Sequence, residues 1–465
     1  MHIVAIGGSD AGISAALRAR EVDPGAEVTV VVADAYPNFS ICGIPYYVSG
    51  EVTHWRNLAH RTYADLEAAG MRLRLDTTAR EIDVAGHALH VTGAAGEAGV
   101  IRYDRLVIGT GAVPVRPPVA GLADLGPADG VHLLHSMDET FAIMRTLEET
   151  GTRRAVIVGA GYVGLEMAEG LTARGLAVTQ LERLPEVLPT VDPELGALVR
   201  AQLAEHGVTV HTGTDVKSIG RAGAGAPDRL RVDAVTSSGE QVTVHAGMVL
   251  VVAGVRPEAG LAVDAGAGVG PRGAIWVDQF MRTGLPDVYA AGDCAVTQHR
   301  LLGTTYLPLG TTAHKQGRVA GENAAGGRRQ FAGSLGTQVV KVFEQATART
   351  GLRDDEAREA GFDPVTVAFE ADDHKAYYPG SHKIAMRFTG DRETGRLLGV
   401  QLFGHRHAEI AKRIDIAATA IYHGMSVDEL GDLDLSYTPP LGSPWDAVQL
   451  GAQAWVRHRD ARRAP

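Results

Sequence analysis

The chain has 465 residues, 45% of them hydrophobic and 21% charged, as expected for a folded protein with more than one core. Its net charge of −11 argues against general nucleic-acid binding, because that function needs a basic face. Two cysteines are too few for a disulfide framework, which fits a reducing, cytoplasmic setting. They also lack the CxxC spacing of a metal site, so we predict no metal. No apolar run is long enough to span a membrane, and the first predicted strand begins at His2, which leaves no room for a signal peptide.

The N-terminal residues predict a dinucleotide-binding βαβ unit. An apolar strand at 2–6 enters a glycine-rich turn at 7–12, and a helix with small inner side chains follows at 13–21. Glycine in such a turn lets the backbone approach a pyrophosphate at the helix N-terminus. The residues predicted to bind the cofactor here are Gly7, Gly8 and Gly12.

This first motif is incomplete at two positions. Ser9 occupies the middle position of the GxGxxG pattern, which weakens the motif when it is considered alone. The next strand, at 27–32, should be closed by a carboxylate that binds the adenosine ribose. Asp34 is the candidate, although it follows the strand by two residues.

A second nucleotide unit has every expected part. A strand at 155–158 leads into Gly-Ala-Gly-Tyr-Val-Gly at 159–164, followed by a helix and by a strand at 177–181 that ends at Glu182. A carboxylate there accepts hydrogen bonds from the ribose hydroxyls and repels a 2′-phosphate, which favours NADH. Arg183 follows at once and could partly accommodate that phosphate. The predicted cofactor residues of this unit are Gly159, Gly161, Tyr162, Gly164 and Glu182.

Two nucleotide units indicate two cofactors, and three further segments combine a buried strand with a glycine turn. These segments lie at 103–112, 248–257 and 287–294. Asp293, which follows a strand directly, can accept a hydrogen bond from a ribityl hydroxyl. Cys294 beside it is interpreted as a small packing residue. The additional candidate cofactor residues are Thr110, Gly111, Gly254, Gly292 and Asp293.

The segment around Cys42 is the candidate for thiol chemistry. Gly43 follows the sulfur, and Pro45 is favourable in the first turn of a helix predicted to continue through 46–48. The sulfur is therefore expected at or just before a helix N-terminus, where the partial positive charge stabilises a thiolate. A lone cysteine is more often a small buried hydrophobe, so this segment alone leaves both interpretations open.

From about residue 334 the pattern changes to a mixed α+β domain without a nucleotide motif. An amphipathic helix is predicted at 408–423, and packing and dimerisation explain most of the domain. The basic end of the chain, at 457–463, is interpreted as a frayed, solvated tail. The predicted strands of this domain are 337–343, 365–369, 383–388 and 397–403.

In their order along nearly the whole chain, these landmarks resemble the pyridine nucleotide-disulfide oxidoreductases, which are flavoprotein reductases with two dinucleotide units. The resemblance implies FAD on the first unit and on Asp293, and NAD(P)H on the second unit. It also implies that Tyr162 stacks over the flavin until the nicotinamide replaces it. The landmarks that carry it are the turns at 7–12, 110–111, 159–164, 254–257 and 291–293.

The expected fold class is α/β, with two Rossmann-like dinucleotide-binding domains (for FAD and NAD) plus a C-terminal α+β dimerisation domain. The expected FAD-binding domain is discontinuous and comprises residues 1–113 and 249–330. The NAD(P)H-binding domain is expected at 114–248 and the dimerisation domain at 334–465.

The single Cys42 before Gly-x-Pro-Tyr is similar to one branch of the family. That branch contains coenzyme A-disulfide reductases, NADH oxidases and persulfide reductases, whereas a CxxxxC pair is absent here. Three segments also look like the branch's C-terminal domain: Tyr377-Tyr378-Pro379-Gly380, Lys412-Arg413-Ile414-Asp415 and Tyr437-Thr438-Pro439-Pro440. The resemblance implies a homodimer in which Tyr437, with Tyr378 or Tyr377, reaches the partner's active site and can donate a proton to a leaving thiolate. The implied catalytic residues are Cys42, Tyr437 and Tyr378.

A coenzyme A-derived substrate is implied less directly. Ser14 and Arg18 occupy positions at which that branch contacts coenzyme A, and Asn38 replaces a serine at a third. Ile41 replaces an asparagine, and Glu21 replaces a basic residue. The implied substrate residues are therefore Ser14, Arg18 and Asn38, with a small thiol or disulfide as the substrate class.

Four functions are ranked on this basis. The first is NAD(P)H-dependent reduction of a small disulfide, persulfide or other thiol-reactive species through one redox-active cysteine. The second is an NADH oxidase that reduces oxygen to water or peroxide. The third is an electron-transfer flavoprotein reductase for a small redox protein, and the fourth is a flavoprotein that signals by binding a partner.

Overall fold

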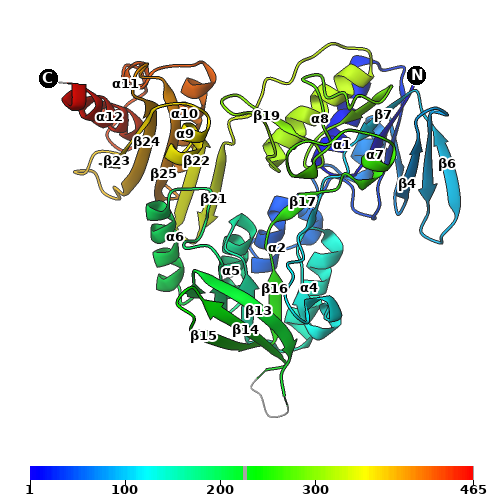
Figure 1. The fold of residues 1–465 in the computed structure, drawn as a ribbon, viewed down its shortest axis with the longest axis horizontal. Coiled ribbons are helices and arrows are strands. Elements are labelled where there is room, and N and C mark those ends of the chain that lie inside the picture. The colour runs from blue at the N-terminus through cyan, green and yellow to red at the C-terminus, as the bar shows by residue number, and fades with distance from the viewer. Residues whose placement is uncertain (224–227, 464–465) are drawn as a thin grey trace. The chain divides into compact units, whose positions relative to one another are not determined.

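The structure is a computed structural model in which residues 1–223 and 228–463 are described (Figure 1). The chain divides into two compact units. The first contains residues 1–115, 134–141 and 254–334, and the second contains the remaining segments, which begin at 116, 142 and 335. Each unit is described by itself.

The first unit is built around a parallel five-stranded sheet, because short runs of β-branched and small apolar residues leave both faces of each strand to be buried. Strand β1 pairs in parallel with β2 and β7, so the crossover from β1 to β2 passes through helix α1 (Asp10–Val22). In spatial order the strands are β18 (Val288–Ala290), β7 (Arg105–Ile108), β1 (His2–Ile6), β2 (Glu27–Val31) and β3 (Met71–Arg74).

Helix α8 (Gly310–Ala324) packs closely on α1, because two of its glycines face the α1 backbone. A Cβ at Gly317 would overlap the carbonyl oxygen of Ala11, and one at Gly321 would overlap that of Ala15. Any larger residue at either position would push the helices apart.

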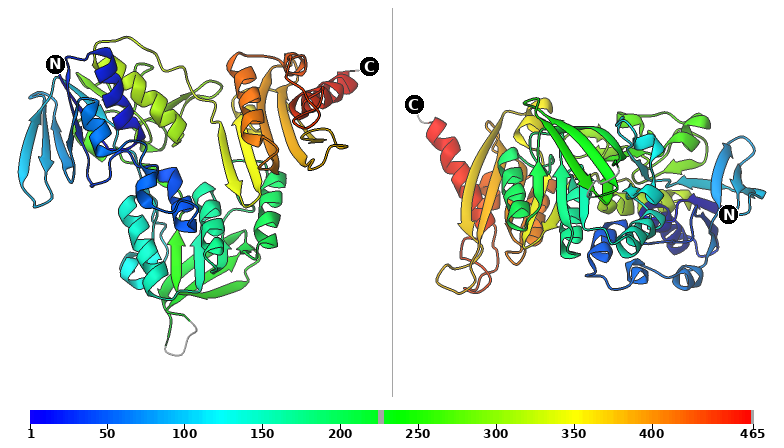
Figure 2. Two further views of the ribbon diagram at one scale, coloured as in Figure 1. Left: turned by 180° about the vertical axis from the view of Figure 1, so that it is seen from behind. Right: turned by 90° about the horizontal axis from the view of Figure 1, so that it is seen from below.

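The other elements of the first unit are short, and β4, β5 and β6 form a separate antiparallel sheet, the light-blue strands in Figure 2. Two antiparallel pairs, β8 with β17 and β19 with β20, complete the strands. The bounds are α2 (Ile44–Ser49), α3 (Tyr63–Ala68), β4 (Thr78–Asp83), β5 (Ala88–Thr92), β6 (Ala98–Arg102), β8 (Ala112–Pro114), β17 (Val255–Pro257), α7 (Gly260–Asp264), β19 (Thr297–His299) and β20 (Gly303–Thr305).

The second unit begins with another parallel five-stranded sheet, in the order β12-β11-β10-β16-β9, and an antiparallel sheet β13-β14-β15. Helix α5 (Tyr162–Ala173) connects β10 to β11. The other bounds are β9 (Val131–His132), α4 (Met137–Glu149, of which 137–141 belong to the first unit), β10 (Arg154–Val158), β11 (Ala177–Leu181), α6 (Pro193–Glu205), β12 (Thr209–His211), β13 (Thr214–Arg221), β14 (Leu230–Thr236), β15 (Gln241–Ala246) and β16 (Met248–Val251).

The C-terminal part of the second unit is an antiparallel sheet, in the order β21-β22-β25-β24-β23, against which α10 and α12 pack. The predicted fold class is therefore confirmed, with Rossmann-like parallel sheets followed by an antiparallel C-terminal domain. The bounds are β21 (Gln338–Val342), β22 (Gln345–Gly351), α9 (Asp354–Glu359), β23 (Pro364–Asp372), β24 (Lys383–Asp391), β25 (Leu397–His405), α10 (Ile410–Tyr422), α11 (Val427–Gly431) and α12 (Ala447–Arg463).

The prediction of a frayed tail at 457–463 is wrong, because these residues continue helix α12. Trp455 anchors the helix, since its indole is fully buried and donates to the carbonyl of Val365 at 2.7 Å. Arg459 then lies over the Trp455 ring and pairs with Asp428 at 2.7 Å. The basic residues therefore continue a docked helix.

Strand β22 was also missed, because its sequence Gln-Ala-Thr-Ala-Arg-Thr-Gly is not apolar. In the sheet its Thr347, Arg349 and Thr350 are nevertheless buried, and Arg349 is neutralised by Glu356 at 2.7 Å.

No helix in the described ranges, 1–223 and 228–463, combines the length and the apolar composition that crossing a bilayer requires.

Candidate active site

The glycine turn after β1 has the tight geometry that a dinucleotide site needs. Gly7 has a φ of 110°, and a Cβ there would overlap the carbonyl oxygen of Gly109. A Cβ at Gly12 would overlap the carbonyl oxygen of Gly7, and one at Gly8 would press on the side chain of Val32. The three predicted glycines therefore bring β1, α1 and the next strands together at the N-terminus of α1, where backbone N–H groups can receive a pyrophosphate.

The two nucleotide units differ at the residue that closes their second strand. In the first unit Ile6 pairs with Val31, so Val32 is the residue after β2. At the same place in the second unit Glu182 follows Leu181, the last residue of β11. Val32 is 3% exposed and apolar, so the first unit has no carboxylate at the position that Glu182 occupies in the second.

Asp34, the predicted ribose ligand of the first unit, lies two residues beyond Val32. Its Oδ1 accepts the N–H of Tyr36 at 2.8 Å, and partial burial raises the pKa of the carboxyl. Its role in binding ribose stays a prediction.

The second glycine turn repeats the first, and its carboxylate is fixed. Gly159 also has a φ of 110°, and a Cβ at Gly164 would overlap its carbonyl oxygen. Glu182 accepts the N–H of Ala160 through Oε2 at 2.6 Å and the N–H of Leu184 through Oε1 at 2.8 Å. The Glu182 carboxylate thus lies directly at the turn.

Two other predicted residues flank this turn. Around Gly161 a Cβ would meet only open space, which leaves the turn accessible from that side. Tyr162 is the first residue of α5, its hydroxyl accepts a hydrogen bond from Thr190 at 3.2 Å, and burial raises its pKa. Its stacking on a flavin stays a prediction.

Asp293 lies just beyond β18, where the backbone turns through Gly292 (φ 82°). Burial, and secondarily the charge of Asp10, raises the pKa of Asp293 to about 6. Within residues 1–223 and 228–463, no side-chain or backbone donor binds this carboxylate. A half-buried acceptor without a donor fits the hydroxyl of a bound ribityl chain, as predicted for FAD.

The remaining predicted residues of the first unit belong to neighbouring turns. Thr110 follows β7 and its hydroxyl donates to the carbonyl of Glu258 at 2.5 Å. Gly111 and Gly254 have φ values of 74° and 98°, and a Cβ on either would meet only open space. These turns lie in the same unit as Asp293.

Cys42 is exposed and lies in a 3₁₀ turn, Ile41–Gly43, that leads directly into α2 with Pro45 in its first turn. The local geometry is the one predicted. Cys294 is fully buried, its thiol donates to the carbonyl of Ala291 at 3.4 Å, and burial raises its pKa. Of the two sulfurs, only that of Cys42 is accessible to a substrate.

A short backbone ladder attaches the Cys42 segment to the glycine turn. Asn38 donates its N–H to the carbonyl of Gly8 at 2.6 Å and accepts the N–H of His60 at 2.9 Å. Ser40 donates to the carbonyl of Leu58 at 2.8 Å. Asn38 has a φ of 60°, is 1% exposed, and its Oδ1 has no donor in the described part of the chain.

The other two predicted substrate residues lie on α1 and already have partners. Ser14 hydrogen-bonds Nδ1 of His314 at 2.9 Å. Arg18 donates to Glu322 at 2.6 and 2.8 Å and to Glu21 at 2.8 Å. Two carboxylates compensate the Arg18 charge, so a bound anion would have to compete with them.

In the second unit, the tyrosines lie on two loops that bond to one another. Tyr377 is 73% exposed, while Tyr378 and Tyr437 are 43% and 44% exposed. Tyr377 and Tyr437 share a side-chain hydrogen bond, and Lys375 donates its N–H to the carbonyl of Pro439 at 3.4 Å.

Arg413 of α10 anchors both tyrosine loops and is 5% exposed. It donates to the carbonyl of Asp373 at 2.6 Å in the first loop. It also donates to both oxygens of Asp446, at 2.9 to 3.2 Å, beyond the second. The carbonyl of Ala408 is its third partner. The segment Lys412-Arg413-Ile414-Asp415 resembles the family's C-terminal domain, but that resemblance did not predict the burial of Arg413 or its bonds to both loops.

An aromatic cluster beside Cys42 was also missed. Phe39 stacks on Trp55 at 5.5 Å, and Tyr36 and Phe141 contact Trp55 edge-on at 5.7 and 5.3 Å. Aromatic residues are only 5% of the chain, so their concentration in this segment was a usable signal. The cluster stabilises the segment that carries the sulfur.

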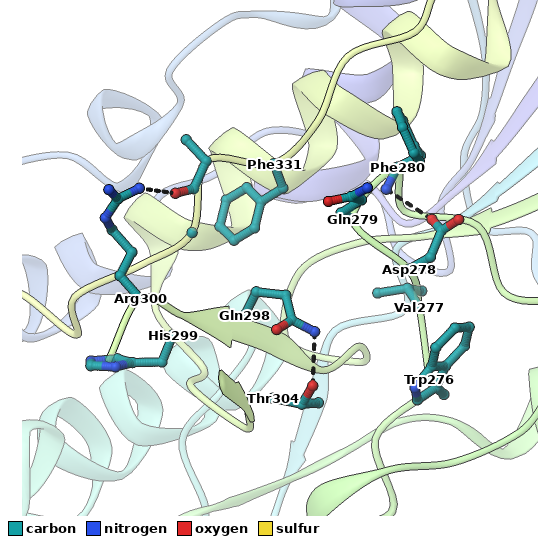
Figure 3. Close-up of a pocket in the computed structure, with 12 residues that line it drawn as sticks. Trp276, Val277, Asp278, Gln279, Phe280, Gln298, His299, Arg300, Thr304 and Phe331 are labelled. Atoms are coloured by element: carbon teal, nitrogen blue, oxygen red, sulfur yellow. Dashed lines mark hydrogen bonds between the residues drawn. The ribbon is translucent and has the colours of Figure 1, made fainter. Parts of the chain in front are cut away.

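A pocket of about 700 Å³ lies elsewhere in the first unit, and no predicted site residue lines it (Figure 3). Gln298 donates to Thr304 at 2.8 Å and Arg300 to the carbonyl of Ala332 at 2.7 Å, while Trp276 lines another side. Because these polar groups have partners, the pocket does not define a chemistry.

Comparison with known proteins places this geometry in a family. Residues 1–317 match the pyridine nucleotide-disulphide oxidoreductase family, and residues 337–447 match its dimerisation domain. The dimerisation domain implies a homodimer.

Individual relatives cover almost the whole chain. The NAD(P)H sulfur oxidoreductase (CoA-dependent) of Pyrococcus furiosus is 34% identical over 96% of this chain and 97% of its own. An NADH oxidase of Methanocaldococcus jannaschii is 32% identical over 97% and 98%. The structure of an NAD-dependent persulfide reductase from A. fulgidus superposes with a TM-score of 0.92 at 38% identity, covering 99% of this chain and 84% of the other. The chain therefore belongs to the pyridine nucleotide-disulphide oxidoreductase family and is an NAD(P)H-dependent FAD oxidoreductase.

Proposed function

We propose that the enzyme transfers two electrons from NADH, by way of FAD, to a small disulfide or persulfide, and that Cys42 is the only sulfur of the chain that reacts. The observation that carries this proposal is the exposed thiol of Cys42, attached through Asn38 to the first glycine turn. Cys294 is fully buried, so a second reactive sulfur is not available.

In the proposed reaction the Cys42 thiolate attacks one sulfur of the substrate S–S bond. A mixed disulfide forms, and the other sulfur leaves as a thiolate or hydrosulfide that takes up one proton. Reduction of the mixed disulfide by two electrons, with uptake of one proton, would release the second thiol and restore the Cys42 thiolate. A single-sulfur cycle needs no partner cysteine, which agrees with a chain that has one exposed cysteine.

The proposed FAD site comprises the turns at Gly7, Gly8 and Gly12, together with Thr110, Gly111, Gly254, Gly292 and Asp293, in the segments 1–113 and 249–330. When bound, FAD supplies the chemistry that carries two electrons from the hydride donor to the sulfur. The protein contributes an open helix N-terminus for the pyrophosphate and the Asp293 acceptor for a hydroxyl. The proposed NAD(P)H site lies in 114–248, around the turn of Gly159, Gly161 and Gly164.

The acceptor is proposed to be a small sulfur compound, with a coenzyme A-derived persulfide or disulfide as the first to be tried. The relatives named for coenzyme A-dependent and persulfide reduction support this class. Ser14, Arg18 and Asn38 are the proposed contacts. The existing partners of Ser14 and Arg18 argue that substrate binding rearranges these side chains.

The exposed tyrosines support a catalytic role for the dimerisation domain. Tyr378 and Tyr437 lie with Leu441 and Trp445 on two adjoining loops, and 43 to 77% of each of these four side chains is exposed. So much exposed apolar surface is typical of an interface between subunits. We propose that either phenol, placed in a partner subunit's site, donates the proton to the leaving sulfur.

Reduction of oxygen is the second candidate function, favoured by the 32% identical NADH oxidase. Here Cys42 would alternate between thiolate and sulfenic acid. Consumption of oxygen at full rate without any disulfide substrate would select this function.

The Cys42→Ser enzyme tests the thiol role. We expect NADH-dependent turnover of a disulfide and persulfide panel to fall below about 1% of wild type, because the serine hydroxyl is not ionised near neutral pH and is not a usable nucleophile there. Anaerobic reduction of FAD by NADH should continue. Cys294→Ala is the matched control and should retain turnover, whereas undiminished turnover in Cys42→Ser would remove Cys42 from the mechanism.

Glu182→Gln tests the coenzyme preference. The carboxylate charge at the second turn should repel a 2′-phosphate, so its removal should lower the ratio of kcat/KM for NADH over NADPH about tenfold. Steady-state kinetics with both coenzymes gives this ratio. Arg183→Ala is the companion variant: a wild-type enzyme that prefers NADPH, and loses that preference in Arg183→Ala, would contradict the assignment.

Asp293→Asn tests whether Asp293 accepts a hydrogen bond from the ribityl chain. The variant should retain FAD less well, and its FAD-free form should be more stable than the wild type. The variant should retain less FAD after gel filtration because it loses the charged acceptor. In the FAD-free protein the same change should stabilise the fold above pH 6 by roughly 1–3 kcal/mol, since a carboxyl whose pKa is raised to about 6 destabilises the native state once ionised.

The sign of this effect depends on pH. Between about pH 4 and 6 the native Asp293 binds more protons than the unfolded chain, so wild-type stability falls as the pH rises through that window. Thermal melts of both FAD-free proteins should therefore converge near pH 4. Equal FAD retention in variant and wild type would exclude Asp293 as a flavin ligand.

Arg413→Lys tests whether the tyrosine loops need their common anchor. Lysine keeps the charge but loses the planar fork that serves both loops, at a cost of roughly 1–3 kcal/mol. We expect weaker dimerisation in analytical ultracentrifugation and lower kcat with unchanged FAD content. The neighbouring Lys412→Ala changes a residue whose side chain is 76% exposed and should behave as wild type. A folded Arg413→Lys protein with normal dimers and turnover would contradict the anchoring role.

A further inference from the structure

Three potential metal ligands meet in the first unit, from three separate segments. Asp10 is the first residue of α1, His314 lies on α8, and His60 lies in a bend, where its N–H donates to the carbonyl of Asn38. One carboxylate oxygen and one ring nitrogen from each histidine all lie within 4.8 Å of one another. The sequence gave no metal motif, because these residues are 50 and 254 positions apart along the chain.

The spacing of the Asp10 and His314 atoms matches a coordination shell. Oδ1 of Asp10 lies 3.3 Å from Nε2 of His314. Two ligand atoms about 2.1 Å from a tetrahedral ion are about 3.4 Å apart, so this pair needs almost no movement to bind one. His60 is exposed, its ring centroid lies 6.2 Å from that of His314, and one of its ring nitrogens lies within 4.8 Å of both other ligand atoms.

Ser14 orients the His314 ring in the way that metal-binding histidines require. Its hydroxyl hydrogen-bonds Nδ1 at 2.9 Å, which leaves Nε2 directed toward Asp10. A hydrogen bond to the second ring nitrogen fixes the tautomer and raises the basicity of the ligating nitrogen. Gly310 lies on the Oδ2 side of the Asp10 carboxylate. A Cβ at this position would lie only 3.2 Å from Oδ2, so the glycine keeps the space beside the carboxylate free.

The local charge also favours a cation. Asp10 and Asp293 lie near enough that the first raises the pKa of the second. Two carboxylates beside a helix N-terminus that receives an anionic cofactor repel one another and that cofactor. A bound cation reverses the sign of the charge at Asp10.

We propose that Asp10, His60 and His314 bind one divalent transition-metal ion of the zinc class. One carboxylate and two imidazoles suit zinc, iron, cobalt or nickel, and three protein ligands leave a coordination position open for water or for a substrate sulfur. The ion also joins α1 and α8 to the segment that pairs with Asn38. The observations behind this site are independent of the proposed function, although Ser14, which orients His314, is also a proposed substrate contact.

The test uses the FAD-loaded enzyme, stripped of metal with a chelator and titrated with Zn²⁺ by calorimetry. We expect one ion per chain. Asp10→Asn, His60→Gln and His314→Gln should each weaken binding by more than the roughly 10–100-fold expected for Ser14→Ala, which removes only the orienting bond. The flavin spectrum and the thermal melt of each variant confirm that it is folded.

Two controls locate the ion. His87→Gln removes a histidine from another His–carboxylate pair of the first unit, 3.8 Å from Asp287, and should bind Zn²⁺ as wild type. Cys42→Ser should also keep binding. Absence of binding in the wild type, equal binding in Asp10→Asn and His314→Gln, or a loss confined to Cys42→Ser would each overturn the proposal.

Discussion

The arrangement of the first unit depends on the backbone of Asn38. Its N–H bonds to Gly8 and its carbonyl to His60, so one residue joins the glycine turn, the sulfur-bearing segment and the segment of the proposed metal ligand. The residue accepts a φ of 60°, a conformation that asparagine tolerates better than most residues do. Its buried Oδ1 accepts no hydrogen bond from the described residues, so it can accept one from a water or a ligand.

The two nucleotide units have the same backbone conformation at their glycine turns but differ in the charge beside those turns. Gly7 and Gly159 have the same φ of 110°, and each turn is closed by a glycine that contacts it. After the second strand the first unit has buried Val32, whereas the second has Glu182 bonded to its own turn. The same fold can therefore hold two different dinucleotides, since the carboxylate is present at this position in only one of them.

Much of this could be predicted from the sequence, because glycine turns and apolar strands are local patterns. The parallel sheets, the helix that begins just after Cys42 with Pro45 in its first turn, and the packed Cys294 all follow from short segments, whereas the exposure of Cys42 did not follow from its segment alone. Strand β22 and helix α12 could not, since their arginines Arg349 and Arg459 are paired with carboxylates of other elements, Glu356 and Asp428, 7 and 31 positions away. The anchoring role of Arg413 could not be predicted either, because its bonds join residues 33 and 40 positions away.

The partners of Ser14 and Arg18 connect the proposed metal ion to substrate binding. Arg18 is already compensated by Glu322 and Glu21, so it offers little net attraction to an anionic substrate. Asp10 adds a negative charge one helical turn from Ser14, which opposes such a substrate further. A divalent ion on Asp10 would change that local charge from −1 to about +1, and its effect would be largest where the site is least hydrated. If the substrate carries phosphate or thiolate groups near Ser14, the ion therefore supplies the attraction that Arg18, held by two carboxylates, does not.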